Sequence, residues 1–306
     1  MAIQKEIWMQ TIVEGLFAPN SFLSKAFNAD SYVNDKIVHI PQAGAPSKVV
    51  KNRSEYPAEV KTRTDTDLTY QMAEFTTDPI RIPHADTVEL SYDKRNSVLR
   101  MDKLTLHDNV ALDFLKGWSP DSANTISTTG AAVAAHTSKA TGNRAAVTKA
   151  DIMNLMTRFN DSEVPQEGRY LLLDAYMYTQ LLNDLTSAEN IAFHAEADPK
   201  NGVLGKLLSF NIMMRSKVLL YKADGTVKDW SAEGAATDNA GALAWHDAYV
   251  CRALGEVKMF GNENDPTYYG DIYSFLVRAG GRIMRADGKG VMALVQGAVA
   301  SQTSAK

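Results

Sequence analysis

The sequence predicts an α+β fold in which one long helix precedes a mixed block of helices and strands. Residues 91–118 carry a helical apolar pattern that no proline interrupts. Residues 169–174 (RYLLLD) form a short, largely apolar run that is typical of a buried strand, and from about residue 243 onward the chain is rich in strand-forming residues. The helices and strands do not alternate regularly, which favours an α+β fold over a doubly wound sheet.

The composition is that of an ordinary folded globule. The 306 residues, with 45% hydrophobic and 22% charged side chains, suffice for one large or two ordinary domains. The formal net charge of −4 leaves no overall positive field to hold nucleic acid. The single cysteine, Cys251, excludes an intrachain disulfide and is expected to be a small buried side chain. The N-terminal residues lack a signal-peptide pattern, and no apolar run approaches the roughly 18 residues of a membrane span.

Residues 3–17 predict a short amphipathic helix. Trp8, Ile12 and Leu16 recur at a spacing of four and therefore form one apolar row. So short a helix needs something to pack against. Two roles are open: docking onto the core of its own chain, or lying as an arm on a neighbouring subunit. The second role makes Trp8, Ile12 and Leu16 candidate inter-subunit contacts.

Residues 46–71 predict an extended segment that its own domain does not support. Threonines alternate here with four charged residues, Lys61, Arg63, Asp65 and Asp67, so an extended backbone places all four charges on one face. The opposite face offers only threonines, and a strand without an apolar face is weakly fixed in register. The segment is either a flexible loop or is held in place by contacts outside its own domain. We expect its charges to form an inter-subunit ion-pair strip, with a solvated surface as the alternative.

The pattern of residues 91–118 corresponds to a helix of about seven turns at ~3.6 residues per turn. Leu106, Val110 and Phe114 lie at a spacing of four on one face. We interpret this element as a structural spine helix because it is well above the usual helix length.

The rest of the chain mixes loops, helices and strands. Residues 119–147 are small and polar and predict a loop or mobile insert. Thr148 and Asp151 have the spacing of a capping box at the start of a helix. The stretch from Tyr268 to Val295 holds two apolar runs around a double glycine and an Asp-Gly pair, and predicts a closing β-hairpin.

The sequence contains no recognisable catalytic or metal-binding motif. The six histidines do not have helical ligand spacing, and HExxH, GxxxxGK[ST] and GxSxG are absent. A GxGxxA match at residues 288–293 lies too near the end of the chain for a dinucleotide-binding unit. We therefore predict no enzymatic activity, cofactor or metal site. The alternative from another class is a hydrolase with a dispersed site that uses His107 or His246 with nearby carboxylates.

The order of these features resembles the major capsid proteins of tailed bacteriophages, the Hong Kong ninety-seven fold that encapsulins share. VHIPQAG at 38–44 is similar to the strand that leads into the extension loop, and SYDKRNSVLR at 91–100 to the start of the spine helix. Residues 164–184 resemble the entry into the axial domain, and GKLLSFNIMMRSKV at 205–218 the strand pair that follows. The run 265–295 is similar to the closing segment of many such coats.

The resemblance implies a structural protein that self-assembles into the icosahedral head enclosing phage double-stranded DNA. It also implies a division of the chain. The N-terminal arm would be 1–45, the extension loop 46–90, the peripheral domain with the spine helix 91–165, the axial domain 166–248, and the return strands shared by both domains 249–306.

The same resemblance implies partners and a location. The subunits would form pentamers and hexamers of a capsid within the virion, after synthesis in the host bacterial cytoplasm, without membrane contact. Because the arm pattern begins at Ile3, directly after Met1, we expect a separate scaffolding protein, together with a portal and decoration proteins. Contact with the enclosed DNA is expected to be weak and non-specific. The alternative within this fold is an encapsulin-like cargo shell.

Overall fold

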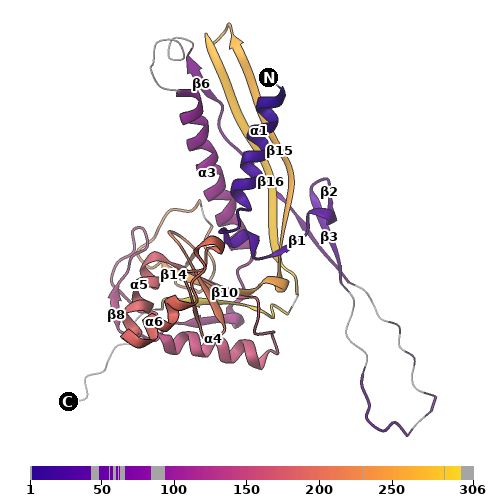
Figure 1. The fold of residues 1–306 in the computed structure, drawn as a ribbon, viewed down its shortest axis with the longest axis vertical. Coiled ribbons are helices and arrows are strands. Elements are labelled where there is room, and N and C mark those ends of the chain that lie inside the picture. The colour runs from indigo at the N-terminus through magenta and orange to yellow at the C-terminus, as the bar shows by residue number, and fades with distance from the viewer. Residues whose placement is uncertain are drawn as a thin grey trace.

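The computed structural model of the chain shows an α+β fold, as predicted. It describes residues 2–42, 48–54, 56–57, 60, 62, 66–83, 94–229, 231–285 and 287–297. Figure 1 shows an elongated region, here called the stalk, that rises from a compact body. The stalk contains α1, α3, β5, β6, β15 and β16, and the body contains α4, α5, α6 and the sheet around β10 and β14.

The bounds of the described helices and strands are as follows. The helices are α1 (Ala2–Leu16), α3 (Lys94–Gly117), α4 (Lys149–Asp161), α5 (Ala175–Asp184) and α6 (Ser187–Ala195). The strands of the first half are β1 (Phe27–Asn28), β2 (Val33–Asn34), β3 (Ile37–Gln42), β4 (Thr66–Gln71), β5 (Ala73–Thr76), β6 (Ile80–Pro83), β7 (Thr125–Ser127), β8 (Ala132–Ala134) and β9 (Asn143–Ala145). Those of the second half are β10 (Arg169–Asp174), β11 (Gly205–Leu207), β12 (Phe210–Arg215), β13 (Leu219–Tyr221), β14 (Asn239–His246), β15 (Val250–Asp265), β16 (Gly270–Ile283) and β17 (Val291–Val295).

The stalk is a twisted sheet with helices on one face. The long strands β15 and β16 pair antiparallel, β5 and β6 both pair with the other edge of β16, and β1 runs parallel to β15. The apolar row of α3 packs on alternate residues of β16, which share one core with it: Leu106, Val110 and Phe114 from the helix, and Phe275 and Val277 from the strand. The predicted spine helix is thus confirmed, and it lies along the stalk.

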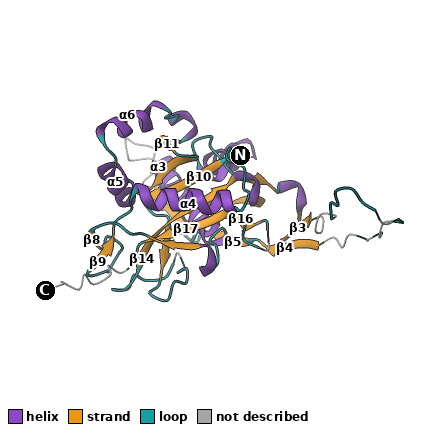
Figure 2. Cartoon of the chain, turned by 90° about the horizontal axis from the view of Figure 1, so that it is seen from below, coloured by secondary structure: helices purple, strands orange, loops and turns teal. Residues whose placement is uncertain are grey.

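The body is built on a seven-stranded sheet that is buried on both faces. Its strand order is β11-β12-β10-β14-β17-β7, with β13 also paired to β14. In β10, Leu171 and Leu173 pack with α4, α5 and α6, whereas Leu172 between them packs with the core around α3. Figure 2 shows α4 lying across this sheet. Burial on both faces explains why the strand has a nearly continuous apolar sequence.

Two predicted loops contain paired strands. Residues 119–147 include β7, which joins the body sheet, and the hairpin β8–β9, so they do not form a simple loop. Within the predicted extension loop, residues 66–83 contribute β4, β5 and β6, which pair with strands of the same chain. Leu68 and Tyr70 provide the apolar side chains that the preceding threonine run lacks: Leu68 is half-buried and Tyr70 buried.

The predicted closing hairpin is wrong. Strand β16 pairs with β15, while β17 belongs to the body sheet between β14 and β7. The double glycine lies inside β16 and makes no turn, since Gly280 and Gly281 pair with Ala253 and Arg252 of β15. The spine helix crosses the strand at Gly281. A Cβ on Gly281 would lie 2.6 Å from Phe114 Cδ1 and 2.7 Å from Trp118 Nε1. Glycine is therefore required by the close approach of the helix. Among the described helices, none is long and apolar enough to cross a membrane.

We predict that Gly281→Ala lowers the free energy of unfolding by about 1–3 kcal/mol, because the added methyl group overpacks the contact with Phe114 and Trp118. Gly280→Ala is a matched control, since its Cβ would meet its nearest neighbour, Met72 Cα, at 3.3 Å. Urea unfolding of the two variants tests this. Equal stability losses at both positions would show that the helix crossing does not select the glycine.

Candidate assembly surfaces

An aromatic cluster joins the N-terminal segment, the stalk and the body. Phe22 lies edge-on to Trp118, with ring centroids 5.8 Å apart, and to Trp245, at 6.3 Å. The two indole rings are themselves 5.7 Å apart. All three side chains are buried. Since Trp118 follows α3 and Trp245 lies in β14, this junction fixes three parts of the chain to one another.

Hydrogen bonds fix the orientation of the junction. The indole of Trp118 donates to the carbonyl of Cys251 at 2.9 Å, and that of Trp245 donates to the carbonyl of Lys25 at 2.8 Å. Arg215 lies over the ring of Phe22 and donates to the Asp108 carboxylate of the spine helix at 3.0 Å. Both indole N–H groups are thus satisfied, as buried donors require.

Helix α1 packs on its own chain through the apolar row that the sequence predicts. Ile12 and Leu16 are buried in the core that also contains α3 and β16, which is the first of the two roles open for this helix. In this arrangement the two side chains are core residues and have no surface left for a neighbouring subunit. The side chain of Trp8 lies outside the described residues. The predicted contact of this helix with another subunit stays a prediction.

The charged row of the extension loop is described at one position only. Lys61, Arg63 and Asp65 lie outside the described residues. Asp67 lies in β4 and places its Oδ2 3.1 Å from Nδ1 of His39 in β3, with both side chains 47% exposed. Asp67 thus has a partner within its own chain, and the inter-subunit ion-pair strip stays a prediction.

The described residues of the segment 48–62 expose large apolar side chains. Val49 is 93% exposed, Tyr56 78% and Val60 95%. Figure 1 shows the described parts of this segment projecting away from both stalk and body. Full burial of one such side chain is worth about 1.5–3 kcal/mol. These residues are therefore the strongest candidates in the described chain for contact with another molecule.

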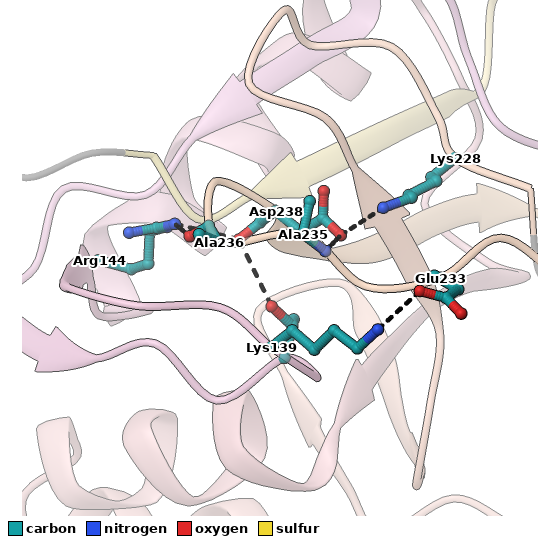
Figure 3. Close-up of polar contacts among 8 residues, drawn as sticks. Lys139, Arg144, Lys228, Glu233, Ala235, Ala236 and Asp238 are labelled. Atoms are coloured by element: carbon teal, nitrogen blue, oxygen red, sulfur yellow. Dashed lines mark hydrogen bonds and ion pairs between the residues drawn. The ribbon is translucent and has the colours of Figure 1, made fainter.

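A polar clamp fixes the 119–147 insert to residues 228–238. The guanidinium of Arg144 donates to the carbonyls of Ala236 and Asp238, each at 3.2 Å, and Asp238 accepts from Lys228 and from the backbone N–H of Ala235, both at 2.7 Å (Figure 3). Burial alone would raise the pKa of Asp238, but these two donors outweigh it and hold that pKa below its usual value. The small, polar sequence of the insert did not indicate this clamp.

A cavity of about 660 Å³ lies beside the clamp, between the end of α3, the insert and residues 228–234. Two ion pairs within the chain lie in its lining: Lys116 with Asp229, and Lys139 with Glu233. His136, which also lines the cavity, donates from Nε2 to the Asp174 carboxylate across 2.7 Å and stacks on Tyr176. The pairing indicates a joint between segments of this chain.

The two histidines of the hydrolase alternative serve packing and capping. His107 lies against α1, and His246 Nδ1 accepts the N–H of Ala248 at 3.1 Å. Burial is the largest influence on both imidazoles and lowers both pKa values. In the described part of the chain, no three His, Cys, Asp or Glu side chains group as metal ligands would.

Comparisons with known proteins agree with this architecture. No protein-family model and no curated protein matches the chain. Among solved structures, the capsid of Ralstonia phage GP4 is similar with a TM-score of 0.64 at 13% identity, over 93% of this chain and 89% of that chain. The head structure of Helicobacter pylori bacteriophage KHP40 gives 0.60 at 12% identity, over 92% and 90%. A virus-like particle from Pyrococcus furiosus gives 0.54 at 11% identity, over 95% and 99%.

The chain has the fold of tailed-bacteriophage capsid proteins. Figure 1 shows the outline of this fold, with a stalk, a body and a segment that projects from the region of β2 and β3. The similarity covers nearly the whole chain in both directions, so the capsid fold describes stalk and body together.

We predict that Phe22→Ala lowers the free energy of unfolding by about 3–5 kcal/mol, because it removes the ring that contacts both tryptophans. Phe27→Ala is the control, since Phe27 lies in the same N-terminal segment and is exposed; its loss is expected to stay near 1 kcal/mol or below. Urea unfolding measures both. A loss at Phe22 no greater than that at Phe27 would contradict the role assigned to the junction.

Proposed function

We propose that the chain is the major capsid protein of a tailed bacteriophage, a structural protein that self-assembles into the icosahedral head around double-stranded DNA. The observation that carries the proposal is the segment 48–62, in which the apolar side chains that the structure describes are exposed to solvent. A subunit that leaves Val49 and Val60 almost fully exposed is suited to burying them against another copy. The capsid fold supports the same conclusion.

Each part of the chain has a role in this proposal. Residues 1–45 form the N-terminal arm and 46–90 the extension loop, which contacts neighbouring subunits. Residues 91–165 and 249–306 supply the peripheral domain and the return strands, and 166–248 the axial domain that points to capsomer centres. Helix α4 packs on the sheet that contains β10 and β14, and β7 and β17 are strands of that sheet.

The partners follow from the proposal. Copies of the chain form pentamers and hexamers in the virion after synthesis in the bacterial cytoplasm, with a separate scaffolding protein, a portal and decoration proteins. Duplex binding depends mainly on Lys and Arg that neutralise phosphates. With 32 basic against 36 acidic residues, the subunit encloses DNA through weak, non-specific contacts. Its function depends on contacts between subunits and on the shape of the subunit, and it involves no enzymatic reaction.

A cargo shell of the encapsulin type is the second candidate, because the fold is also similar to the virus-like particle from Pyrococcus furiosus. The two functions differ in what the particle contains. Double-stranded DNA and a portal at one vertex identify a phage head, whereas an enclosed protein identifies a cargo shell.

Electron microscopy of the expressed chain, alone and with the product of a candidate scaffold gene, tests the function. We expect closed shells, sheets or rings of five and six subunits. A uniform small particle under every condition would exclude a shell protein and favour the hydrolase alternative. Particles, where they form, are then assayed for nucleic acid and for enclosed protein.

We predict that the double variant Val49→Ser, Val60→Ser folds normally but assembles poorly. Both side chains are exposed, so the change in unfolding free energy should stay within about 0.5 kcal/mol. In a shell, every subunit would lose both apolar contacts. The control is Val49→Ile with Val60→Ile, which keeps the apolar surface and should still assemble. Particle yield by sedimentation measures the effect, and equal yields from the two double variants would remove this segment from the assembly surface.

A further inference from the structure

The last turn of α1 rests directly on a histidine of the spine helix. A Cβ on Gly15 would lie 2.3 Å from Cε1 of His107 and 3.0 Å from its Nδ1, so a glycine is needed where the helix crosses the ring. The imidazole also donates a hydrogen bond to the backbone carbonyl of Ile12. The docking of α1 through its buried Ile12 and Leu16 is therefore coupled to the state of one imidazole.

The surroundings of His107 do not favour a positive charge. On the spine helix, the ammonium of Lys103 opposes protonation and the carboxylate of Asp108 favours it. That carboxylate already accepts from Arg215 at the end of β12, at 3.0 Å, so it is partly neutralised. A cavity of about 410 Å³ borders Gly15, His107, Asp108 and Arg215, which gives water and protons a route to this contact.

We propose that His107 is a pH-sensitive latch that holds the N-terminal helix on the spine helix when its imidazole is neutral and weakens that docking when it is protonated. The proposal rests on the Gly15 contact and the half-buried ring, and it does not depend on the proposed function. In a shell subunit, such a latch would let mild acid change the availability of the N-terminal arm.

The direction of the pH effect follows from the two states of the ring. Burial, the largest influence, lowers the pKa of His107 in the docked state, whereas an undocked imidazole has its ordinary value of about 6.5. Docking is thus at full strength above pH 6.5 and weakens as the pH falls toward the docked pKa. Between these two values the opening equilibrium rises by up to about tenfold per pH unit.

Hydrogen exchange followed by mass spectrometry on the full chain tests the latch. With rates corrected for intrinsic exchange, protection of residues 2–16 should fall by roughly three- to tenfold from pH 7.5 to 5.5, relative to α4. His107→Gln, a neutral side chain, should abolish this fall. His246→Gln should keep it, although burial also lowers the pKa of His246.

A second variant covers the case in which His107→Gln itself undocks the helix. Gly15→Ala forces a methyl group onto the ring and should give, at pH 7.5, exchange at least as fast as that of the unaltered chain at pH 5.5. Protection that does not change with pH in the unaltered chain would overturn the latch. An equal fall with pH in His107→Gln, or undisturbed protection in Gly15→Ala, would overturn it as well.

Discussion

The close packing of the spine helix on β16 is the constraint on which the rest of the structure depends. A Cβ on Gly117 would lie 2.2 Å from the carbonyl oxygen of Gly281, so helix and strand meet there with no side chain between them. This approach places Trp118 where it reaches the carbonyl of Cys251 and the rings of Phe22 and Trp245. The N-terminal segment, the stalk and the body consequently share one continuous core.

The interior of the molecule and the projecting segment 48–62 differ in how far their apolar side chains are buried. The body sheet is buried on both faces, and two ion pairs within the chain, Lys116 with Asp229 and Lys139 with Glu233, lie beside the 660 Å³ cavity. The segment 48–62 instead presents apolar side chains to solvent, as at Val49 and Val60. An exposed apolar segment on a well-packed subunit marks a site of association. This contrast is what the proposed shell function explains.

Local patterns in the sequence predicted local structure well. The apolar row of the spine helix, the capping box of Thr148 and Asp151 and the apolar run of β10 all appear as expected. Long-range pairing was harder: Gly280 and Gly281 have the sequence of a turn, yet both lie inside β16, and the crossing of the spine helix explains the glycine at position 281. Similarly, the apolar row of α1 that contains Ile12 is suited to packing either on the core of its own chain or on a neighbouring subunit. The spacing of its residues in the sequence does not distinguish these two roles. The Arg144 clamp depends on residues about 90 positions apart.

In the proposed shell, the aromatic junction is stabilised by contacts within one chain, whereas the segment 48–62 is stabilised by contacts with another subunit. Hydrogen exchange on dissociated subunits and on assembled particles compares these regions in one experiment. The account predicts that residues 48–62 exchange almost freely in the subunit and gain strong protection in the particle, while the protection around Trp118 and Trp245 is high in both. Equal protection of residues 48–62 in the two states would contradict the account.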